Sequence, residues 1–488
     1  MWEYRVGHII DELRKIPDES VQMVVTSPPY WGLRIYSGEQ EIIWGGDEKC
    51  KHEWTEAGGG LHHENRNFHS GTQDEVKGQG PLVNVREDAR SKSGLCQKCG
   101  AWRGAFGLEP EISLYVEHTV QILREIRRVL RKDGVVFWNI GDSYATRLEG
   151  DGWGDYEWNT GGAVAPEKGT VSKHKRERTS GLKPKDLCLI PFRVALAVQA
   201  DGWWCRSDIV WVKPNPMPES CTDRPTKSHE YIFLFTKSKD YYWDQEAVRE
   251  SSTCADPASP NYRARGKSDS REKHGGVEGG VKPAFGNEGF YQPTSRNIRS
   301  VWTIATQPYA EAHFATFPEE LPERCIKAGS SERGNCPDCG APWVRAIKRK
   351  KTPRTERTDN PNIGGLMRCP AEIDQVTTMG WRPTCSHYPR TNEWVEYIDF
   401  EDTKNPTAEE LSENERRAKV QAELLEFWKP LKTIPALILD PFAGSGTTLW
   451  VARRLGRHAI GIDISNQYKE LGTKRAKLDV PAIESYGD

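Results

Sequence analysis

Strand and helix patterns alternate along much of this sequence, and this alternation restricts the fold more than any other feature. The segment VQMVV at 21–25 has the continuous apolar character of a strand buried on both faces. Before it, helical spacing places Ile9, Ile10, Leu13 and Ile16 on one face. Such alternation predicts an α/β fold, in which helices cover both faces of a mostly parallel sheet.

The rest of the chain outside two polar insertions follows the same pattern. Two strand patterns between residues 203 and 236 are separated by too little chain for a helical crossover, so we expect a terminal antiparallel pair. The longest helix should stop at Gly134. Strands are expected at 2–6, 135–142, 204–212, 230–236, 436–440 and 458–463, and helices at 108–134, 187–200, 446–456 and 465–478.

Length and composition limit the class of protein. A chain of 488 residues is too long for one typical core, so two or more folding units are expected. No apolar run is long enough to cross a bilayer, and the N-terminus lacks the pattern of a secretory signal, which predicts a soluble cytoplasmic protein without a membrane partner. Because the net charge is −2, any contact with nucleic acid must come from local basic patches.

The 12 cysteines are clustered rather than evenly spread. In a reducing compartment, clustered cysteines are more typical of metal sites than of disulfides. Two groups each combine a Cys-x-x-Cys with a Cys-x-His, a closed set of three thiolates and one imidazole that suits structural zinc. Cys325 and Cys369 are alternative ligands at the second site. The predicted ligands are Cys50, His52, Cys96 and Cys99 in the first site and Cys336, Cys339, Cys385 and His387 in the second.

A glycine-rich turn follows the strand at 436–440. Gly444 and Gly446 would let the backbone approach a ligand, and Asp463 ends the next strand, where a carboxylate can bind both hydroxyls of a ribose. No lysine follows Gly446, which disfavours nucleotide hydrolysis. A nucleoside-containing cofactor is therefore predicted, whereas a glycine pair alone would equally suit a plain tight turn.

The strand at 21–25 ends in the stiff sequence Thr-Ser-Pro-Pro-Tyr. Pro28 and Pro29 fix an extended loop, which can present Ser27 Oγ and a backbone carbonyl as acceptors beside the ring of Tyr30. Two acceptors and a ring fit an exocyclic amine on a flat heterocycle. A Pro-Pro turn that merely leaves the sheet is the alternative.

These motifs resemble those of a known family. TSPPYW at 26–31 and DPFAGSGTT at 440–448, in this order, resemble the permuted (β) class of DNA amino-methyltransferases, in which the catalytic motif precedes the cofactor motif. The resemblance covers most of the chain outside the insertions and implies a Rossmann-like, S-adenosylmethionine-dependent methyltransferase fold. A serine in the first motif position is commoner in cytosine-N4 enzymes, and an aspartate in adenine-N6 enzymes. Further matching segments are 128–144, 210–220, 224–244 and 313–330.

The resemblance also implies where the cofactor binds. Asp463 would bind the ribose of S-adenosylmethionine, and the segment HFATFP would enclose its methionine end. Gly7-His8 departs from the Gly-Asp that relatives often carry, which puts a polar contact to the cofactor's adenine in doubt. The remaining cofactor residues would be Asp440, Phe442, Gly444 and Gly446 around the cofactor, with Phe314, Thr316 and Pro318 in the enclosing segment.

The expected chemistry is methyl transfer to a base extruded from double-stranded DNA. Ser27 Oγ and the Pro28 carbonyl would accept the two amine hydrogens and turn the nitrogen lone pair toward the methyl donor. The catalytic set is Ser27, Pro28, Pro29 and Tyr30; the target-base pocket would add Trp31 as a second wall and Lys213 and Asn215, whose KPNP segment could equally be a simple turn.

Residues that read the DNA sequence are harder to identify. The segment 246–312 suits a target-recognition region by length and position, although disorder in the absence of DNA fits its composition equally well. The basic runs 173–178 and 348–354 could contact phosphates, but such runs are more often solvated loops.

Three functions fit the sequence. The leading one is a site-specific cytosine-N4 DNA methyltransferase; the others are an adenine-N6 enzyme of the same fold and an inactive, zinc-dependent DNA-binding protein. A cognate restriction endonuclease would make this chain the protective half of a restriction pair, but neither that partner nor the oligomeric state follows from one sequence. The expected division is core at 1–44, 109–245 and 399–488, zinc insertions at 45–108 and 331–398, target recognition at 246–312 and a cofactor segment at 313–330.

Overall fold

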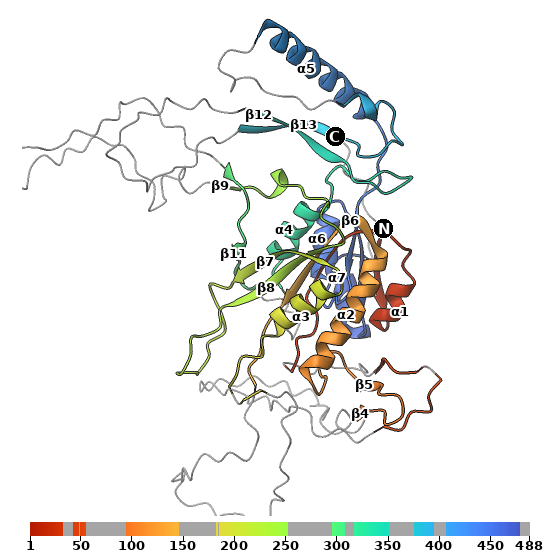
Figure 1. The fold of residues 1–488 in the computed structure, drawn as a ribbon, viewed down its shortest axis with the longest axis vertical. Coiled ribbons are helices and arrows are strands. Elements are labelled where there is room, and N and C mark those ends of the chain that lie inside the picture. Colours follow the sequence, from red (N-terminus) through yellow and green to blue (C-terminus); the bar gives the residue numbers. More distant parts are fainter. Residues whose placement is uncertain are drawn as a thin grey trace, which may run out of the picture. The chain divides into compact units, whose positions relative to one another are not determined.

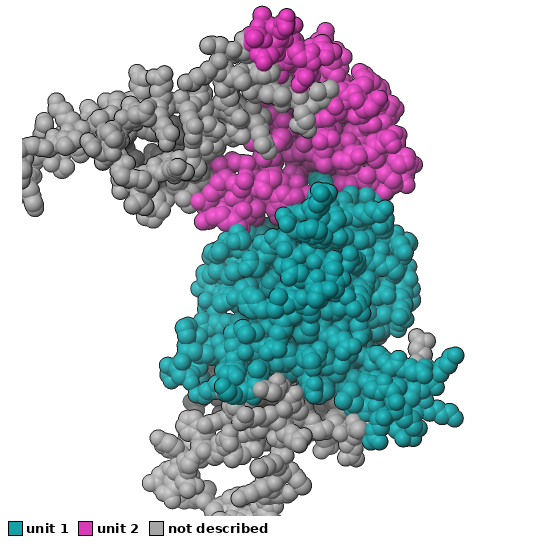
Figure 2. All heavy atoms as spheres, viewed as in Figure 1, with its two compact units in different colours: residues 1–242, 300–326, 437–488 teal, residues 243–299, 327–436 magenta. Residues whose placement is uncertain are grey.

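The computed structural model describes residues 1–32, 42–47, 49–54, 94–145, 182–183, 185–251, 295–307, 317–350, 375–394 and 407–478. The chain forms two compact units (Figure 2): residues 1–242, 300–326 and 437–488 in unit 1, and residues 243–299 and 327–436 in unit 2. None of the helices in the described ranges is both long and apolar enough to span a bilayer.

Unit 1 is built on an eight-stranded sheet of order β1-β15-β14-β2-β6-β8-β7-β11 (Figure 1). Neighbours from β1 to β6 run parallel, and β8 runs antiparallel to both β6 and β7. The mostly parallel α/β sheet and the antiparallel pair are therefore confirmed. The strands are β1 Trp2–Val6, β2 Val21–Thr26, β6 Leu130–Ile140, β7 Trp204–Val212, β8 His229–Thr236, β11 Val301–Thr303, β14 Leu437–Asp440 and β15 His458–Asp463.

The helices of unit 1 follow from the directions of the crossovers. The connections β1 to β2 and β2 to β6 advance along the sheet, whereas β14 to β15 returns, so right-handed crossovers place their helices on opposite faces. Accordingly α1 contacts α2 and α2 contacts α3, while α6 contacts α7. Bounds are α1 Ile9–Arg14, α2 Ile112–Val129, α3 Ile190–Ala200, α6 Thr447–Arg454 and α7 Asn466–Arg475; α4 spans Glu320–Gly329.

Two details differ from the sequence prediction. Helix α2 ends at Val129 and β6 begins at once, so the prediction of Gly134 as a helix stop was wrong. A Cβ at Gly134 would lie 2.7 Å from the carbonyl oxygen of Gln22, so this glycine lets β6 approach β2 where their register shifts. In addition, the short strand β11 pairs outside β7 and was not predicted.

The first cysteine-rich insertion contributes a small antiparallel sheet to unit 1, in the order β3-β5-β4. Its strands are β3 Ile42–Trp44, β4 Gly94–Leu95 and β5 Trp102–Gly104. Trp44 and Trp102 are almost fully buried and belong to the main core cluster of this unit. The insertion therefore shares the core of the sheet.

Unit 2 combines a β12-β13 hairpin with a long helix, α5, which begins with a capping box formed by Thr407 and Glu410. Cys336, Trp343, Tyr388, Leu424 and Trp428 form its buried core. Most of 246–312, the run 173–178 and most of the run 348–354 lie outside the described residues, and the predicted domain boundaries stay predictions. Bounds are η1 Glu246–Val248, β9 Glu250–Ser251, β10 Ser295–Arg296, β12 Val344–Lys350, β13 Gln375–Arg382, η2 Thr391–Glu393 and α5 Ala408–Trp428.

Candidate active site

Strands β2 and β14 are parallel neighbours, so their carboxyl ends open at the same edge of the sheet. The Thr26 hydroxyl donates to Asp440 Oδ1 (2.6 Å), and the Thr448 hydroxyl donates to Oδ2 (2.5 Å). The amide of Phe442 also donates to Oδ1 (3.1 Å). Asp440 is 1% exposed, and burial raises its pKa to about 6. Its carboxyl group thus joins the two predicted motifs from inside the protein.

The two glycines of the loop after β14 have different surroundings. At Gly444, with a φ of +48°, an added Cβ would meet no atom within 4 Å. At Gly446, with a φ of +76°, it would lie 2.7 Å from the Cα of Gly472 in α7. Gly446 is therefore required by close packing, whereas Gly444 leaves an open side next to the backbone.

Asp463, at the end of β15, holds this glycine loop in place. Its Oδ2 accepts from the amide of Gly444 (3.1 Å), and its Oδ1 accepts from the amide of Ser465 (2.9 Å). The Tyr4 hydroxyl donates to the Gly444 carbonyl (2.6 Å). Burial raises the pKa of Asp463 to about 6. The loop is thus fixed from both of its neighbouring strands.

Arg475 of α7 anchors the start of α6. Its guanidinium donates to the hydroxyls of Ser445 (3.0 Å) and Thr447 (2.8 Å) and lies 3.5 Å from a carboxylate oxygen of Glu319. Glu319 also pairs with Arg454 of α6 (2.7 Å). These contacts tie the segment before α4 to the glycine loop.

The segment predicted to enclose the methionine end of the cofactor is only partly described. Phe314 and Thr316 lie outside the described residues, and Pro318 is buried just before α4. The carbonyl of Pro318 accepts from the amide of Leu321 (3.1 Å) as the helix begins. Pro318 therefore adjoins the Glu319 anchor.

At the end of β2, Ser27 belongs to a cluster of polar side chains. Its Oγ lies 3.1 Å from the Tyr30 hydroxyl and 3.2 Å from Asn139 Nδ2. The Tyr30 hydroxyl donates to Glu230 Oε2 (2.6 Å), and Asn139 Nδ2 donates to the same carboxylate oxygen (3.1 Å). Lys213 forms an ion pair with Glu230 Oε1. The cluster brings together residues from four parts of the chain.

The proline loop is held by backbone contacts. The Tyr115 hydroxyl donates to the Pro29 carbonyl (3.0 Å), and the amide of Gly32 donates to the Gly107 carbonyl (2.8 Å). Gly107 has a φ of +92°, and a Cβ there would lie 3.0 Å from the Cβ of Pro29. Within the described chain, no donor reaches the Pro28 carbonyl. One proline carbonyl is thus used internally, while the other has no protein partner.

Two predicted pocket residues lie elsewhere than expected. Trp31 is 3% exposed, and its indole donates to the Glu109 carbonyl (2.9 Å). The ring is not exposed to a base, so we correct its place from the wall of a pocket to a support beneath the loop. Asn215 Oδ1 accepts from the amide of Thr306 (3.0 Å), which ties the loop after β7 to the end of β11.

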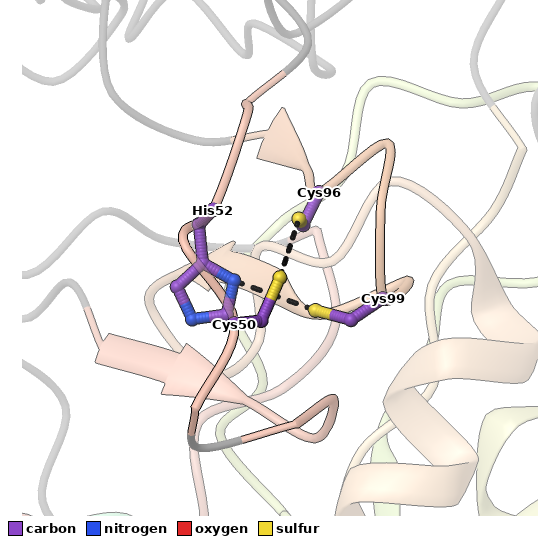
Figure 3. A group of neighbouring side chains, drawn as sticks. All are labelled: Cys50, His52, Cys96 and Cys99. Carbon is purple, nitrogen blue, oxygen red and sulfur yellow. Dashed lines mark hydrogen bonds between the residues drawn. The ribbon is translucent and has the colours of Figure 1, made fainter.

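Both predicted cysteine-histidine clusters are assembled. Figure 3 shows the first, where Cys50 and Cys96 sulfurs are 3.9 Å apart and Cys99 Sγ is 3.4 Å from His52 Nδ1. In tetrahedral zinc with Zn–S near 2.3 Å, ligand sulfurs are about 3.8 Å apart, so the donors fit zinc. Within each cluster the ligand atoms lie within 4.8 Å of one another: Cys50, His52, Cys96 and Cys99, and Cys336, Cys339, Cys385 and His387.

The two Cys-x-x-Cys turns have the same backbone structure. The amide of Gly100 donates to the Cys96 carbonyl (2.9 Å), and that of Gly340 donates to the Cys336 carbonyl (2.8 Å). Both glycines have a positive φ, +73° and +69°. Of the two alternative ligands, Cys325 lies in α4 and outside the cluster, and Cys369 lies outside the described residues.

The first cluster is connected to the proline loop through stacked rings. His118 of α2 stacks on Trp44 (centroids 4.5 Å apart) and on Trp102 (5.5 Å). Its Nδ1 lies 3.0 Å from Glu109 Oε1, and Glu109 Oε2 accepts from the amide of Gly107 (2.9 Å). Burial raises the pKa of Glu109. The insertion thus supports the turn on which the prolines rest.

A second ring contact reaches the glycine loop. Phe106 stacks on Phe442 (centroids 5.6 Å apart) and on Tyr115 (5.0 Å). Phe442 also meets the edge of Trp138 (6.2 Å). Phe442 is therefore held by aromatic neighbours from β6 and the insertion.

Sequence reasoning missed several of these partners. The only sequence signals were an amide in a buried strand (Asn139) and an acidic residue at the start of an apolar strand (Glu230). Arg475, Tyr115 and His118 occupy ordinary helical positions and gave no signal.

Comparison with known proteins agrees with this geometry. The profile of a family described as DNA methylase, comprising N6 and N4 methyltransferases, matches residues 21–339 and 431–474. The type II methyltransferase M.Cfr9I of Citrobacter freundii is 34% identical over 327 residues, which cover 66% of this chain and 71% of that protein. M.SfiI of Streptomyces fimbriatus is 27% identical over 475 residues, 95% of this chain and 88% of the relative.

Among solved structures, the cytosine-N4-specific PvuII DNA methyltransferase matches with a TM-score of 0.40 and 12% identity, covering 99% of this chain and 87% of that one. A DNA modification methylase of Thermus thermophilus in complex with S-adenosylmethionine gives a TM-score of 0.37 at 14% identity, covering 99% and 98%. The extent of the family match is decisive. The chain belongs to the N6/N4 DNA methylase family and is a DNA methyltransferase with the fold of the S-adenosylmethionine-dependent enzymes.

Proposed function

We propose that this protein transfers a methyl group from S-adenosylmethionine to the exocyclic N4 amine of cytosine in double-stranded DNA. The observation that carries the proposal is the bond from Thr26 to Asp440 (2.6 Å), which joins the Ser27 loop to the glycine loop at one sheet edge. Serine in the first motif position favours N4 of cytosine over N6 of adenine. The type II DNA methyltransferases among the relatives support DNA as substrate.

The cofactor would lie against the glycine loop. S-adenosylmethionine supplies an electrophilic methyl group on a sulfonium. The open side of Gly444 lets the backbone approach it, and the Asp463 carboxylate can accept from the ribose hydroxyls. Because the pKa of Asp463 is about 6, this carboxyl group is mostly ionised at neutral pH. Phe442 and the Pro318 segment complete the proposed site.

Ser27 and Pro28 would orient the target amine. Its nitrogen shares a lone pair with the ring and is therefore a weak nucleophile. Hydrogen bonds from its two hydrogens to Ser27 Oγ and the Pro28 carbonyl would favour a pyramidal nitrogen with its lone pair toward the methyl group. Because the methylated nitrogen is cationic and acidic, no strong base is required.

The target base must leave the duplex to reach these acceptors. We assign Tyr30 as the ring that stacks on the extruded base, because it adjoins both Ser27 and the Pro28 carbonyl along the loop. A Cβ at Gly141 would lie 2.6 Å from Tyr30 Cε2, so one side of the ring packs against backbone. The loop carrying Lys213 and Asn215 would border the pocket at the same edge, since β7 ends where β8 begins.

The direct test is methyl transfer from labelled S-adenosylmethionine to duplex DNA, followed by nucleoside digestion and mass spectrometry. N4-methylcytosine is the expected product. N6-methyladenine would retain the fold and the cofactor site but overturn the assignment made from Ser27. No product on DNA of varied sequence, together with retained DNA binding, would favour the binding-only alternative.

We also propose one structural zinc ion in each cysteine-histidine cluster. Three thiolates and an imidazole leave no open coordination position, so the metal would stabilise the fold rather than take part in the chemistry. Elemental analysis should find two zinc ions per chain. Cys99→Ser and Cys339→Ser should each lose one, and a metal-free wild-type protein would contradict the proposal.

The relatives' designation as type II methyltransferases further suggests a cognate restriction endonuclease. Under this proposal, cellular DNA methylated by the protein resists cleavage at the shared recognition site. Expression of the chain in a host, followed by digestion of the host DNA with a panel of endonucleases, would identify that site. Uniform cleavage by the whole panel would contradict it.

A further inference from the structure

Glu230 receives hydrogen bonds from three sides. Its Oε2 accepts from the Tyr30 hydroxyl (2.6 Å) and from Asn139 Nδ2 (3.1 Å), and its Oε1 pairs with the ammonium of Lys213. An ionised carboxylate can only accept hydrogen bonds. Every bond that ends at Glu230 therefore points toward it.

This direction determines the orientation of the next two hydroxyls. Tyr30 has one hydroxyl proton, and it is directed to Glu230, so the phenol oxygen acts as an acceptor toward its other neighbours. Asn139 Nδ2 donates to that oxygen (2.9 Å), and Ser27 Oγ lies 3.1 Å from it. The Ser27 proton is consequently directed to Tyr30.

Ser27 is then left with an acceptor position. Its proton points to Tyr30, and one lone pair accepts from Asn139 Nδ2 (3.2 Å). The second lone pair can meet the amine hydrogen of the target base. If the order were reversed, the hydroxyl would donate to the amine nitrogen and hold the lone pair that must attack the methyl group.

We propose that Glu230 is a positioning residue that sets the direction of the hydrogen-bond chain from Ser27 through Tyr30, so that Ser27 meets the substrate as an acceptor. The inference rests on the proposed function. A second acidic residue near this edge, Asp142, is engaged differently: its Oδ1 accepts from the amides of Ser143 (2.9 Å) and Ile190 (3.0 Å).

The decisive variant is Glu230→Gln, which preserves shape but adds a donor. Its amide can donate to Tyr30, which allows Tyr30 to donate to Ser27 and Ser27 to donate into the pocket. We expect kcat to fall at least tenfold, while KM for DNA, the Kd for S-adenosylmethionine and the melting temperature stay close to wild type. Glu230→Asp, which keeps the carboxylate, should retain more activity than the Gln variant.

A double-mutant cycle separates positioning from general structural damage. Tyr30→Phe keeps the ring but removes the hydroxyl that connects Glu230 to Ser27, so Glu230→Gln should have no further effect on kcat in that background. Glu219→Gln, which removes an exposed ion pair with Arg224 on the same loop, should leave kcat unchanged.

The possible outcomes are distinguishable. Additive effects of Glu230→Gln and Tyr30→Phe, or wild-type kcat in the Gln variant, would overturn the inference while methylation by the wild type upheld the proposed function. Absence of methylated product from the wild-type protein would overturn the proposed function and this inference with it.

Discussion

The loops after β2 and β14 lie at the same sheet edge but are held in place differently. The loop at Ser27 contains two prolines, and its contacts come from other segments, such as Tyr115 on the Pro29 carbonyl. The loop at Gly444 contains glycines and is held by carboxylates at the ends of its own and the neighbouring strand.

The difference follows from the residues used. Proline has no N–H to offer, so a proline loop needs hydroxyl and amide donors from elsewhere to fix its carbonyls. Glycine amides can be bound by a nearby carboxylate. We therefore expect the proline loop to respond to changes in distant residues, and the glycine loop to respond mainly to local ones.

The largest effect should come from Gly446→Ala. A Cβ there would lie 2.7 Å from the Cα of Gly472 at a φ of +76°, so we expect a loss of about 3 kcal/mol in the free energy of unfolding. Gly444→Ala is the matched control: with no atom within 4 Å it should lose about 1 kcal/mol, yet bind S-adenosylmethionine weakly. Chemical denaturation and calorimetry would measure both, and equal losses of stability would refute the distinction.

Asp463→Asn should come next. The amide would keep the shape of the side chain but weaken acceptance from the ribose, and we expect S-adenosylmethionine to bind about thirtyfold more weakly, or about 2 kcal/mol. The proline loop should be unaffected, so DNA binding in the absence of cofactor serves as the control. Unchanged cofactor affinity in a titration would refute the ribose assignment.

The pH dependence of cofactor binding should be smaller. Since the pKa of Asp463 is about 6, its carboxylate is progressively lost below that pH, and affinity for S-adenosylmethionine should fall about tenfold from pH 7 to pH 5. The stability of the empty protein should change in the opposite direction. Because burial raises the folded pKa values of Asp440 and Asp463 above 3.8, their contribution is complete below about pH 4 and is lost as pH rises through about 6.

Calorimetric titration from pH 5 to pH 8 would measure the affinity, with Asp463→Asn as the control that lacks the titrating group. A wild-type affinity that is constant over this range would show that the ionised carboxylate is not needed for binding.

The smallest effect should come from Tyr115→Phe. It removes the hydroxyl that donates to the Pro29 carbonyl but keeps the ring that stacks on Phe106, so we expect kcat to fall about fivefold, or about 1 kcal/mol. The Kd for S-adenosylmethionine should stay constant because the glycine loop has its own anchors. A rise in that Kd without a change in kcat would show that the two loops are not held independently.

The sequence predicts well what depends on local spacing. The strands around Ser27 and Asp440 follow from short apolar runs, and the ligands of each cluster follow from Cys-x-x-Cys and Cys-x-His spacing. That Ser27 and Asp440 would lie at one edge follows from the alternation of parallel strands, because their carboxyl ends share an edge.

What the sequence misses depends on pairing across the fold. Glu230 and Tyr30 are 200 positions apart, and no local pattern indicates that they meet. Trp31 was misplaced because an aromatic residue beside a loop suits burial and base stacking equally well, and only packing decides between them. Gly134 was misplaced because a glycine after a helical pattern resembles a helix stop, although close approach to Gln22 is what requires it.

The strand order has a consequence for how the protein is synthesised. β14 and β15 lie between β1 and β2, so the first two strands made are separated by strands made near the end. Thr26 and Asp440 are 414 positions apart, and a ribosome adding 5–20 residues per second needs about 20 to 80 s to cover that distance. During that time β1 and β2 lack their neighbours in the sheet. A nascent chain therefore cannot assemble the joined loops until its last strands emerge, and a prematurely released chain would carry unpaired strand edges in place of an active site.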